Sequence, residues 1–235
     1  MREARRADLI ITLSRTVADR LVSSRLAPAE RVVPLFHPDI TFGQPPAERM
    51  RLPGSPLRLL FFGRILPYKG LSLLIEAMAM LRAQGIAVHL GVAGQGDISR
   101  YQARLAALGA EVINRWIEEE EIPPLLARYD AIALSHVEAS QSGVAATAFG
   151  SCMPAIGTPV AGIAEQVVDG KTGLLARRLS ARAFADAAAR LALDPGLYQR
   201  MARHLKESAH ERSMARFLDL LLDDTLALAE PRREH

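Results

Sequence analysis

Aromatic side chains, cysteines and dense basic clusters are all scarce in this sequence of 235 residues. Aromatic residues make up 5%, so a folded core has to be built mainly from aliphatic side chains. The one cysteine, Cys152, excludes an internal disulfide and fits a reducing compartment. The 29 basic and 26 acidic residues leave a net charge of +3, and no Lys/Arg run is dense enough to indicate nucleic-acid binding.

Long uninterrupted apolar runs are missing as well. The first apolar run, residues 9–13, is too short for a secretory signal. Residues 139–164 carry no charge, but Pro154, Pro159 and several glycines break them up, so they cannot cross a bilayer as one helix. We therefore expect a cytoplasmic protein without a transmembrane segment.

What the sequence does contain is a regular alternation of short aliphatic runs with longer helical patterns. Most runs are apolar at nearly every position, which is typical of parallel strands buried on both faces. Between them, apolar residues recur at intervals of three and four, as in residues 71–81 and 184–191. Such alternation predicts an α/β fold with a doubly wound, Rossmann-like parallel sheet. The predicted strands are residues 9–13, 32–36, 57–63, 87–93, 112–117, 131–134, 155–157 and 173–176.

A proline-rich segment interrupts this alternation at residues 37–56 and is predicted to be a linker. Six strand candidates follow it, enough for a complete domain over residues 57–209. Only two precede it, so residues 1–36 are interpreted as the remnant of another domain. Residues 210–235 are predicted to form a C-terminal helix and tail. The poorly covered strands of the remnant favour a homodimer.

The first candidate site lies directly after the first strand of the main domain, in the segment GRILPYKG at residues 63–70. Ligands bind open α/β sheets at the carboxyl ends of the strands. Gly63 permits close approach of a ligand to the backbone, and Arg64 and Lys69 can both reach a diphosphate. The alternative is a solvated loop that carries two basic residues.

A second loop, AGQGD, follows the next strand and contains Gly94 and Gly96. Its small residues could admit a sugar or a phosphate, and a plain tight turn explains them equally well. The dinucleotide fingerprint is absent, because it needs a third glycine where this chain has Ser99.

The third candidate is EASQSGV, residues 138–144, between a predicted strand and an alanine-rich helix. Glu138 is followed by three hydrogen-bonding side chains, of which Ser140 or Ser142 can cap the helix. Amides near Gly143 would then face an anion, helped by the helix dipole. A capped helix beside an exposed acid is the alternative, but it does not explain why Glu138 stands among so many small residues.

Several weaker features remain. Glu165 is predicted at another helix start near the same edge of the sheet. Trp116 is predicted to close a strand, where it either forms a wall of a base pocket or packs at the rim of the core. Cys152 is expected to be buried and inert. The histidines lack metal-ligand spacing, so no metal site is predicted.

Together, these motifs resemble the C-terminal, donor-binding half of GT-B glycosyltransferases of the large retaining family four. The resemblance runs through LLFFGRILPYKG (59–70), residues 91–96, 131–150 and 154–175, in the family's order. Residues 8–38 similarly resemble the end of the family's acceptor domain. The segment EASQSGV is most similar to members that build bacterial surface polysaccharides.

The resemblance implies a nucleotide-sugar (UDP- or GDP-sugar) as co-substrate, no cofactor and no metal. Arg64 and Lys69 would neutralise the leaving diphosphate, Glu138 would contact hydroxyls of the donor sugar, and the sugar would be transferred with retained configuration to a glycan or lipid-linked acceptor. Arg115, Trp116 and Ile117 would contact the base. The other residues implied in binding are Gly63, Gly94, Gly96, Ser140, Gln141, Ser142, Gly143, Val144 and Glu165.

Two departures from the family pattern stand out. Where the family usually has a second glutamate eight residues after the first, this chain has Ala146. Nearly all of the acceptor domain is also missing, so the resemblance implies a chain that is inactive alone and is completed by an acceptor domain or a partner subunit. It also implies a peripheral location at the inner face of a membrane. The alternative is a non-catalytic nucleotide-sugar-binding or interaction module. An NAD-dependent oxidoreductase is disfavoured by the missing glycine fingerprint.

Overall fold

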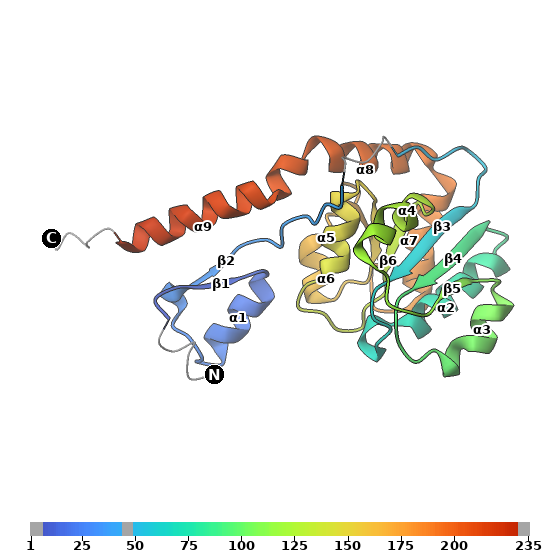
Figure 1. Cartoon of the computed structure of the whole chain (residues 1–235). Coiled ribbons are helices and arrows are strands. Elements are labelled where there is room, and N and C mark those ends of the chain that lie inside the picture. The colour runs from blue at the N-terminus through green and yellow to red at the C-terminus, as the bar shows by residue number, and fades with distance from the viewer. Residues whose placement is uncertain (1–6, 44–48, 230–235) are drawn as a thin grey trace.

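The structure is a computed structural model that describes residues 7–43 and 49–229. It consists of a large α/β unit and a small N-terminal unit, with a long C-terminal helix that extends from the large unit (Figure 1). No helix among the described residues is long and apolar enough to cross a membrane.

The large unit is built on a six-stranded parallel sheet in the order β5-β4-β3-β6-β7-β8. The chain starts in the middle at β3, moves outward through β4 and β5, and then returns to the other side of β3. The point where this order reverses, between β3 and β6, is where open α/β sheets bind ligands. The strands are β3 (Leu57–Phe62), β4 (Val88–Ala93), β5 (Glu111–Ile113), β6 (Ala131–Leu134), β7 (Ala155–Gly157) and β8 (Gly173–Leu175).

Helices cover both faces of this sheet, and each face has its own apolar core. One face is covered by α2 (Leu71–Ala83), α3 (Gln102–Ala107), α7 (Ala181–Leu193) and α8 (Pro195–Glu207). The other is covered by α4 (Ile122–Ala127), α5 (Gly143–Gly150) and α6 (Ala161–Gln166). The predicted periodicity of α2 is confirmed, since the side chains at its three- and four-residue intervals are buried. The doubly wound parallel sheet is therefore confirmed.

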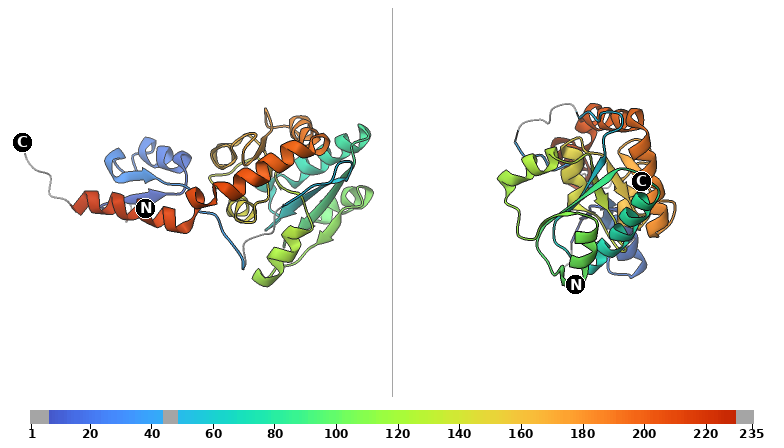
Figure 2. Two further views of the ribbon diagram at one scale, coloured as in Figure 1. Left: turned by 90° about the horizontal axis from the view of Figure 1, so that it is seen from above. Right: turned by 90° about the vertical axis from the view of Figure 1, so that its right-hand side faces the viewer.

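The small unit holds two parallel strands and one helix: β1 (Ile10–Thr12), α1 (Arg15–Ser23) and β2 (Val32–Pro34). A short 3-10 turn, η1 (Ala29–Arg31), leads into β2. The C-terminal helix α9 (Met214–Ala229) runs alongside this unit, as Figures 1 and 2 show from different directions. An edge-on contact between the rings of Phe36 and Phe217, 6.0 Å between centroids, joins the two.

The segment after β2 is held against the large unit by polar contacts. The amide of Ile40 donates to the Ala146 carbonyl in α5 at 3.1 Å. Asp39 pairs with Arg212 of the 3-10 turn η5 (Ala209–Arg212) at 3.0 Å. Further along the chain, the Arg49 guanidinium donates to the backbone carbonyls of Leu126, Tyr129 and Ser151, at distances of 2.7 to 3.1 Å. Asp39, Ile40 and Arg49 all lie within the predicted linker, residues 37–56, so parts of that segment are anchored on the large unit.

Two predicted strands are wrong in extent. The strand predicted at residues 32–36 ends at Pro34, and the error is larger at β5. Residues 112–117 were expected to form a strand, but β5 ends at Ile113. It is an edge strand that pairs with β4 across only three residues, so no ladder continues past that point. Residues 114–117 therefore form a loop, and Trp116 does not close a strand.

Candidate functional site

Two loops at the switch point are joined by hydrogen bonds. The first contains the 3-10 turn η2 (Pro67–Lys69), and the second follows β6. The amide of Val137 donates to the Tyr68 carbonyl at 2.8 Å, and the Ser135 hydroxyl donates to the Lys69 carbonyl at 2.8 Å. Because backbone carbonyls of η2 accept both hydrogen bonds, the bonds hold this turn in place and so fix the direction in which the Lys69 side chain projects.

Lys69 is nearly buried at this junction, with 9% of its surface exposed. Its Nζ donates to the Phe62 carbonyl at 3.3 Å, and a Cβ added to Gly63 would lie 3.0 Å from Nζ and 3.3 Å from Val144 Cγ2. The structure thus brings Gly63, Lys69 and Val144 together. Burial is the larger cause and the nearby charge of Arg64 the smaller one of a Lys69 pKa lowered to about 8. The ammonium is therefore charged at neutral pH, but its positive charge is poorly balanced by the protein around it.

His136 packs beside Lys69 and was not predicted from the sequence. Its ring is 4% exposed, and the Nδ1 atom has no hydrogen-bond partner among the residues that the structure describes. Burial, and then the charge of Lys69, lower its pKa to about 4, with a partial offset from the Leu134 carbonyl. The ring is therefore neutral near pH 7 and adds no positive charge to the site.

The N-terminus of α5 faces the same place. Of the two predicted candidates, Ser140 and Ser142, it is Ser142 that caps the helix, because its hydroxyl accepts from the Ala145 amide at 3.3 Å. The amides of Gly143 and Val144 donate no hydrogen bond among the described residues. These two donors, the helix dipole and the Lys69 ammonium form one positive region that suits a phosphate.

A second histidine reaches this helix end from a distant part of the sequence. His37 Nε2 lies 3.9 Å from the position of a Cβ on Gly143. Its other nitrogen, Nδ1, lies 2.9 Å from the Pro38 carbonyl, which can only accept, so Nδ1 carries the proton. Nothing local in the sequence signals this contact, which joins positions 37 and 143.

Glu138 and the residues after it line the approach to α5. Glu138 and Ser140 are exposed, and Glu138 stands one residue beyond Val137, which is bonded to η2. The side-chain oxygen of Gln141 is buried and has no hydrogen-bond partner among the described residues. This segment packs closely on α6, because a Cβ on Gly162 would lie 2.3 Å from the Ser140 backbone.

Gly94 and Gly96 serve contacts within the protein. A Cβ on Gly94 would lie 2.1 Å from the Gly63 carbonyl oxygen, and one on Gly96 would lie 2.4 Å from the Ile65 carbonyl oxygen. The Gly96 amide also donates to Asn114 Oδ1 at 3.1 Å. Both glycines therefore let the loops after β3 and β4 touch.

Arg115, Trp116 and Ile117 point in different directions. Arg115 forms an ion pair with Glu121 at 2.6 Å, Trp116 is 60% exposed, and Ile117 is buried in the core. Glu121 closes the 3-10 turn η4 (Glu119–Glu121), which precedes α4. Of these three residues, Trp116 is the one that presents an exposed aromatic ring.

The structure corrects the predicted position of Glu165. It was expected at the start of a helix, but it lies in the last turn of α6. Its carboxylate accepts from the amides of Arg15 and Thr16, at 2.7 and 2.8 Å, and from the Thr16 hydroxyl. Glu165 therefore satisfies the start of α1 and ties the small unit to the large one.

Replacing Glu165 with alanine should loosen this tie. Losing an N-terminal capping partner costs a helix about 0.5–2 kcal/mol. At about 1–2 kcal/mol of local stability, amide exchange at Arg15 and Thr16 would speed up roughly 5- to 30-fold. Hydrogen exchange should reveal this in residues 15–23 and leave β3 and β6 unchanged. Glu207→Ala, at an exposed position on α8, is the control; equal exchange in both variants would contradict the capping role.

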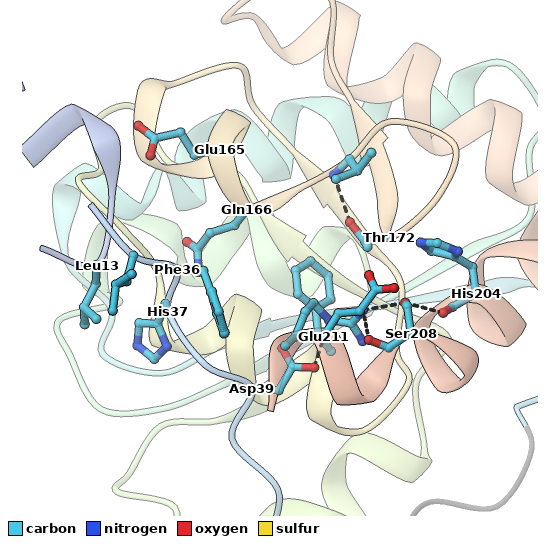
Figure 3. A pocket seen from close by; sticks show the side chains of 14 residues that line it. Leu13, Phe36, His37, Asp39, Glu165, Gln166, Thr172, His204, Ser208 and Glu211 are labelled. Atoms are coloured by element: carbon cyan, nitrogen blue, oxygen red, sulfur yellow. Dashed lines mark hydrogen bonds and ion pairs between the residues drawn. The ribbon is translucent and has the colours of Figure 1, made fainter. Parts of the chain in front are cut away.

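A separate cavity of about 380 Å³ lies where the small unit, α6, α8 and η5 meet (Figure 3). Leu13 and Phe36 line one side, and His204, Ser208 and Arg212 line the other. Arg212 donates to Asp39, to Ser208 and to the Leu205 carbonyl. Burial raises the pKa of Asp39 to about 6, and Arg212 offsets only part of that rise. The hydrogen bonds of Arg212 therefore pair the polar groups of this cavity with one another and join the two units.

Among the described residues, no group of three or more His, Cys, Asp or Glu side chains could hold a metal ion. The positive charge at the switch point comes from Lys69, Arg64 and helix α5.

Solved structures of similar fold include Anabaena HepE in complex with UDP, with a TM-score of 0.73 and 18% identity over 94% of this chain and 64% of that one. The C-terminal domain of the group 1 glycosyltransferase LpcC from Francisella tularensis matches with a TM-score of 0.57 and 20% identity, over 72% of this chain and 96% of that one. At these identities the likeness shows the fold.

Curated relatives are more similar in sequence. A D-inositol 3-phosphate glycosyltransferase of Kribbella flavida is 35% identical over 64% of this chain and 39% of its own length. One from Saccharomonospora viridis is 30% identical over 88% of this chain and 55% of its own length. The putative colanic acid biosynthesis glycosyltransferase WcaL of Salmonella typhimurium is 29% identical over 77% of this chain and 47% of its own length. The chain thus spans about half the length of the relatives it matches. The model of the family described as "Glycosyl transferases group 1" matches residues 56–194, more than half of the chain, which therefore belongs to this family.

Proposed function

We propose that this chain is the donor-binding half of a glycosyltransferase that binds a UDP- or GDP-sugar. The observation that carries the proposal is the positive region at the switch point, where the buried Lys69 ammonium stands beside the free amides of Gly143 and Val144. A diphosphate is the ligand that such a region suits best. Residues 57–209 form the donor domain in this proposal, and residues 1–36 belong to the acceptor side.

The chemistry proposed is transfer of the sugar with retained configuration to a glycan or lipid-linked acceptor. Lys69, Arg64 and the α5 amides stabilise the charge that develops on the leaving diphosphate, so the step needs no metal. Glu138 orients the donor sugar through its hydroxyls. Acceptor-side groups come from a further domain or partner subunit, and the reaction takes place in the cytoplasm, at the inner membrane face where the acceptor is lipid-linked.

Calorimetric titration of the full chain with UDP, GDP, their common sugar conjugates and NAD tests the proposal. Saturable binding of one nucleoside diphosphate and its sugars supports the donor site. Binding of NAD alone, or of no nucleotide, contradicts it. A sugar conjugate should bind at least as tightly as its parent nucleotide, since Glu138 adds contacts to the sugar.

A second candidate function is a nucleotide-sugar-binding module without catalysis. Ala146 favours it, because that position carries no carboxylate for the ribose hydroxyls and is 1% exposed. The two candidates differ in turnover. Transfer of labelled sugar when an acceptor-domain protein that co-purifies with this chain is added supports the enzyme, whereas tight donor binding without transfer in the presence of that protein supports the module.

Donor affinity should fall as the pH rises from 7 to 9. The Lys69 pKa is lowered to about 8 by burial and by Arg64, so the free protein loses this positive charge within the window, while His136, with its pKa near 4, stays neutral throughout. Loss of one charge-assisted hydrogen bond, about 1.5 kcal/mol, corresponds to roughly tenfold weaker binding. In Lys69→Met the calorimetric affinity for the same ligand should be flat over this range; a parallel fall in both proteins would assign the titration elsewhere.

A further inference from the structure

A second basic region lies beyond β8, the edge strand at the end of the sheet opposite β5. A cavity of about 320 Å³ opens there between the end of β8 and one face of α7. Sheet order puts three strand spacings between β3 and β8, roughly 14 Å at ordinary spacing. Because it lies after the carboxyl end of β8, this cavity shares the donor site's edge of the sheet but is separate from it.

The walls of this cavity carry an excess of positive charge. Arg177 and Arg178 line it from the loop after β8, and Arg190 lines it from α7. None of these three guanidinium groups forms an ion pair among the residues that the structure describes. The one carboxylate in the lining, Asp186, is paired with Arg182 at 3.1 Å. Three exposed arginines therefore line one cavity, and the one carboxylate in its lining is already paired with another arginine.

The floor of the cavity is apolar and small. Leu175, Ala183 and Ala187 line it, and Ala183 and Ala187 project from the same face of α7 as Arg190. Small side chains here leave the space that the arginines surround, and an apolar floor strengthens charge interactions above it. Leu179, which follows Arg178 in the sequence, is 47% exposed.

We propose that this arginine-rimmed cavity binds a phosphate group, carried either by a small soluble molecule or by an anionic lipid headgroup. The forked guanidinium donors match the oxygens of a phosphate and bind it in pairs. The volume lies at the lower end of the range for small-ligand sites, which suits one phosphate-bearing group.

The test compares Arg177→Ala/Arg178→Ala with Arg200→Ala/Arg203→Ala, a control with the same loss of charge at exposed positions on α8. Two probes separate the sources of phosphate: pyrophosphate by calorimetry with the donor site saturated by UDP, and flotation with vesicles of phosphatidylcholine containing 30% phosphatidylglycerol. Wild type and control should bind one of the probes, and the cavity variant should bind it at least tenfold more weakly. Arg190→Ala should repeat the loss.

Three results would overturn the proposal: no binding of either probe to the wild type, equal binding by the cavity variant, or equal loss in the control variant, which would reveal general charge attraction. Thermal unfolding checks that each variant is folded. UDP binding is measured separately, so failure of the proposed donor site is distinguishable from failure of this cavity. Should UDP not bind, the pyrophosphate titration without it still compares the same variants.

Discussion

Replacing Lys69 with methionine should weaken the binding of UDP by about 10- to 150-fold. Hydrogen bonds to charged groups contribute about 1.5–3 kcal/mol, and each 1.4 kcal/mol is a factor of ten in affinity. Methionine keeps the length and apolar stem of the side chain but removes the ammonium. The loss is expected because Nζ, within the part of the chain that the structure describes, donates only to the Phe62 carbonyl at 3.3 Å, which leaves two of its hydrogens for a diphosphate.

The same substitution should leave the fold intact or stabilise it. Burial lowers the pKa of Lys69, so the folded protein pays to keep this group charged at neutral pH. A methionine removes that cost, and the melting temperature should be unchanged or higher. Lys171→Met, in an exposed turn before β8, is the matched control and should change neither property. Affinity within twofold of wild type in Lys69→Met would remove this lysine from the donor site.

The sheet was predictable because its strands are buried on both faces. β6 and β7 were predicted with their observed ends, and β3, β4 and β8 to within one residue at each end. The failure at β5 has a physical cause: an edge strand is limited by its partner, and the apolar character of Val112 and Ile117 does not reveal where the ladder with β4 stops.

Within the candidate site, local motifs were more informative than single residues. The loop at residues 63–70 and the helix start at Gly143 converge as expected, because the carboxyl ends of adjacent parallel strands meet at one edge. The roles of Glu165 and His37 were not predictable, since their partners stand 149 and 106 positions away: Thr16 for the first and Gly143 for the second. Such contacts depend on how the small unit and the segment after it dock, which no local pattern encodes.

The turn that presents Lys69 should depend strongly on Gly70. This residue has a φ of +70°, and a Cβ there would lie 1.9 Å from the Ser135 carbonyl oxygen. In Gly70→Ala the left-handed backbone costs about 1–2 kcal/mol, and forcing two backbones apart adds about 1–3 kcal/mol. In urea unfolding, the free energy of unfolding should therefore fall by about 2–5 kcal/mol in total.

Gly85 provides a control with nearly the same backbone and no neighbour. Its φ is +72°, and no atom lies within 4 Å of a Cβ placed there. Gly85→Ala should therefore lose only the backbone part, about 1–2 kcal/mol. The difference between the two variants isolates the contact between the η2 loop and the segment after β6. If both lose the same stability, the two loops are free to separate, and the close packing that fixes the direction of Lys69 would not hold. If Gly70→Ala loses more and also weakens UDP binding, the contact that stabilises the sheet edge also positions the cation.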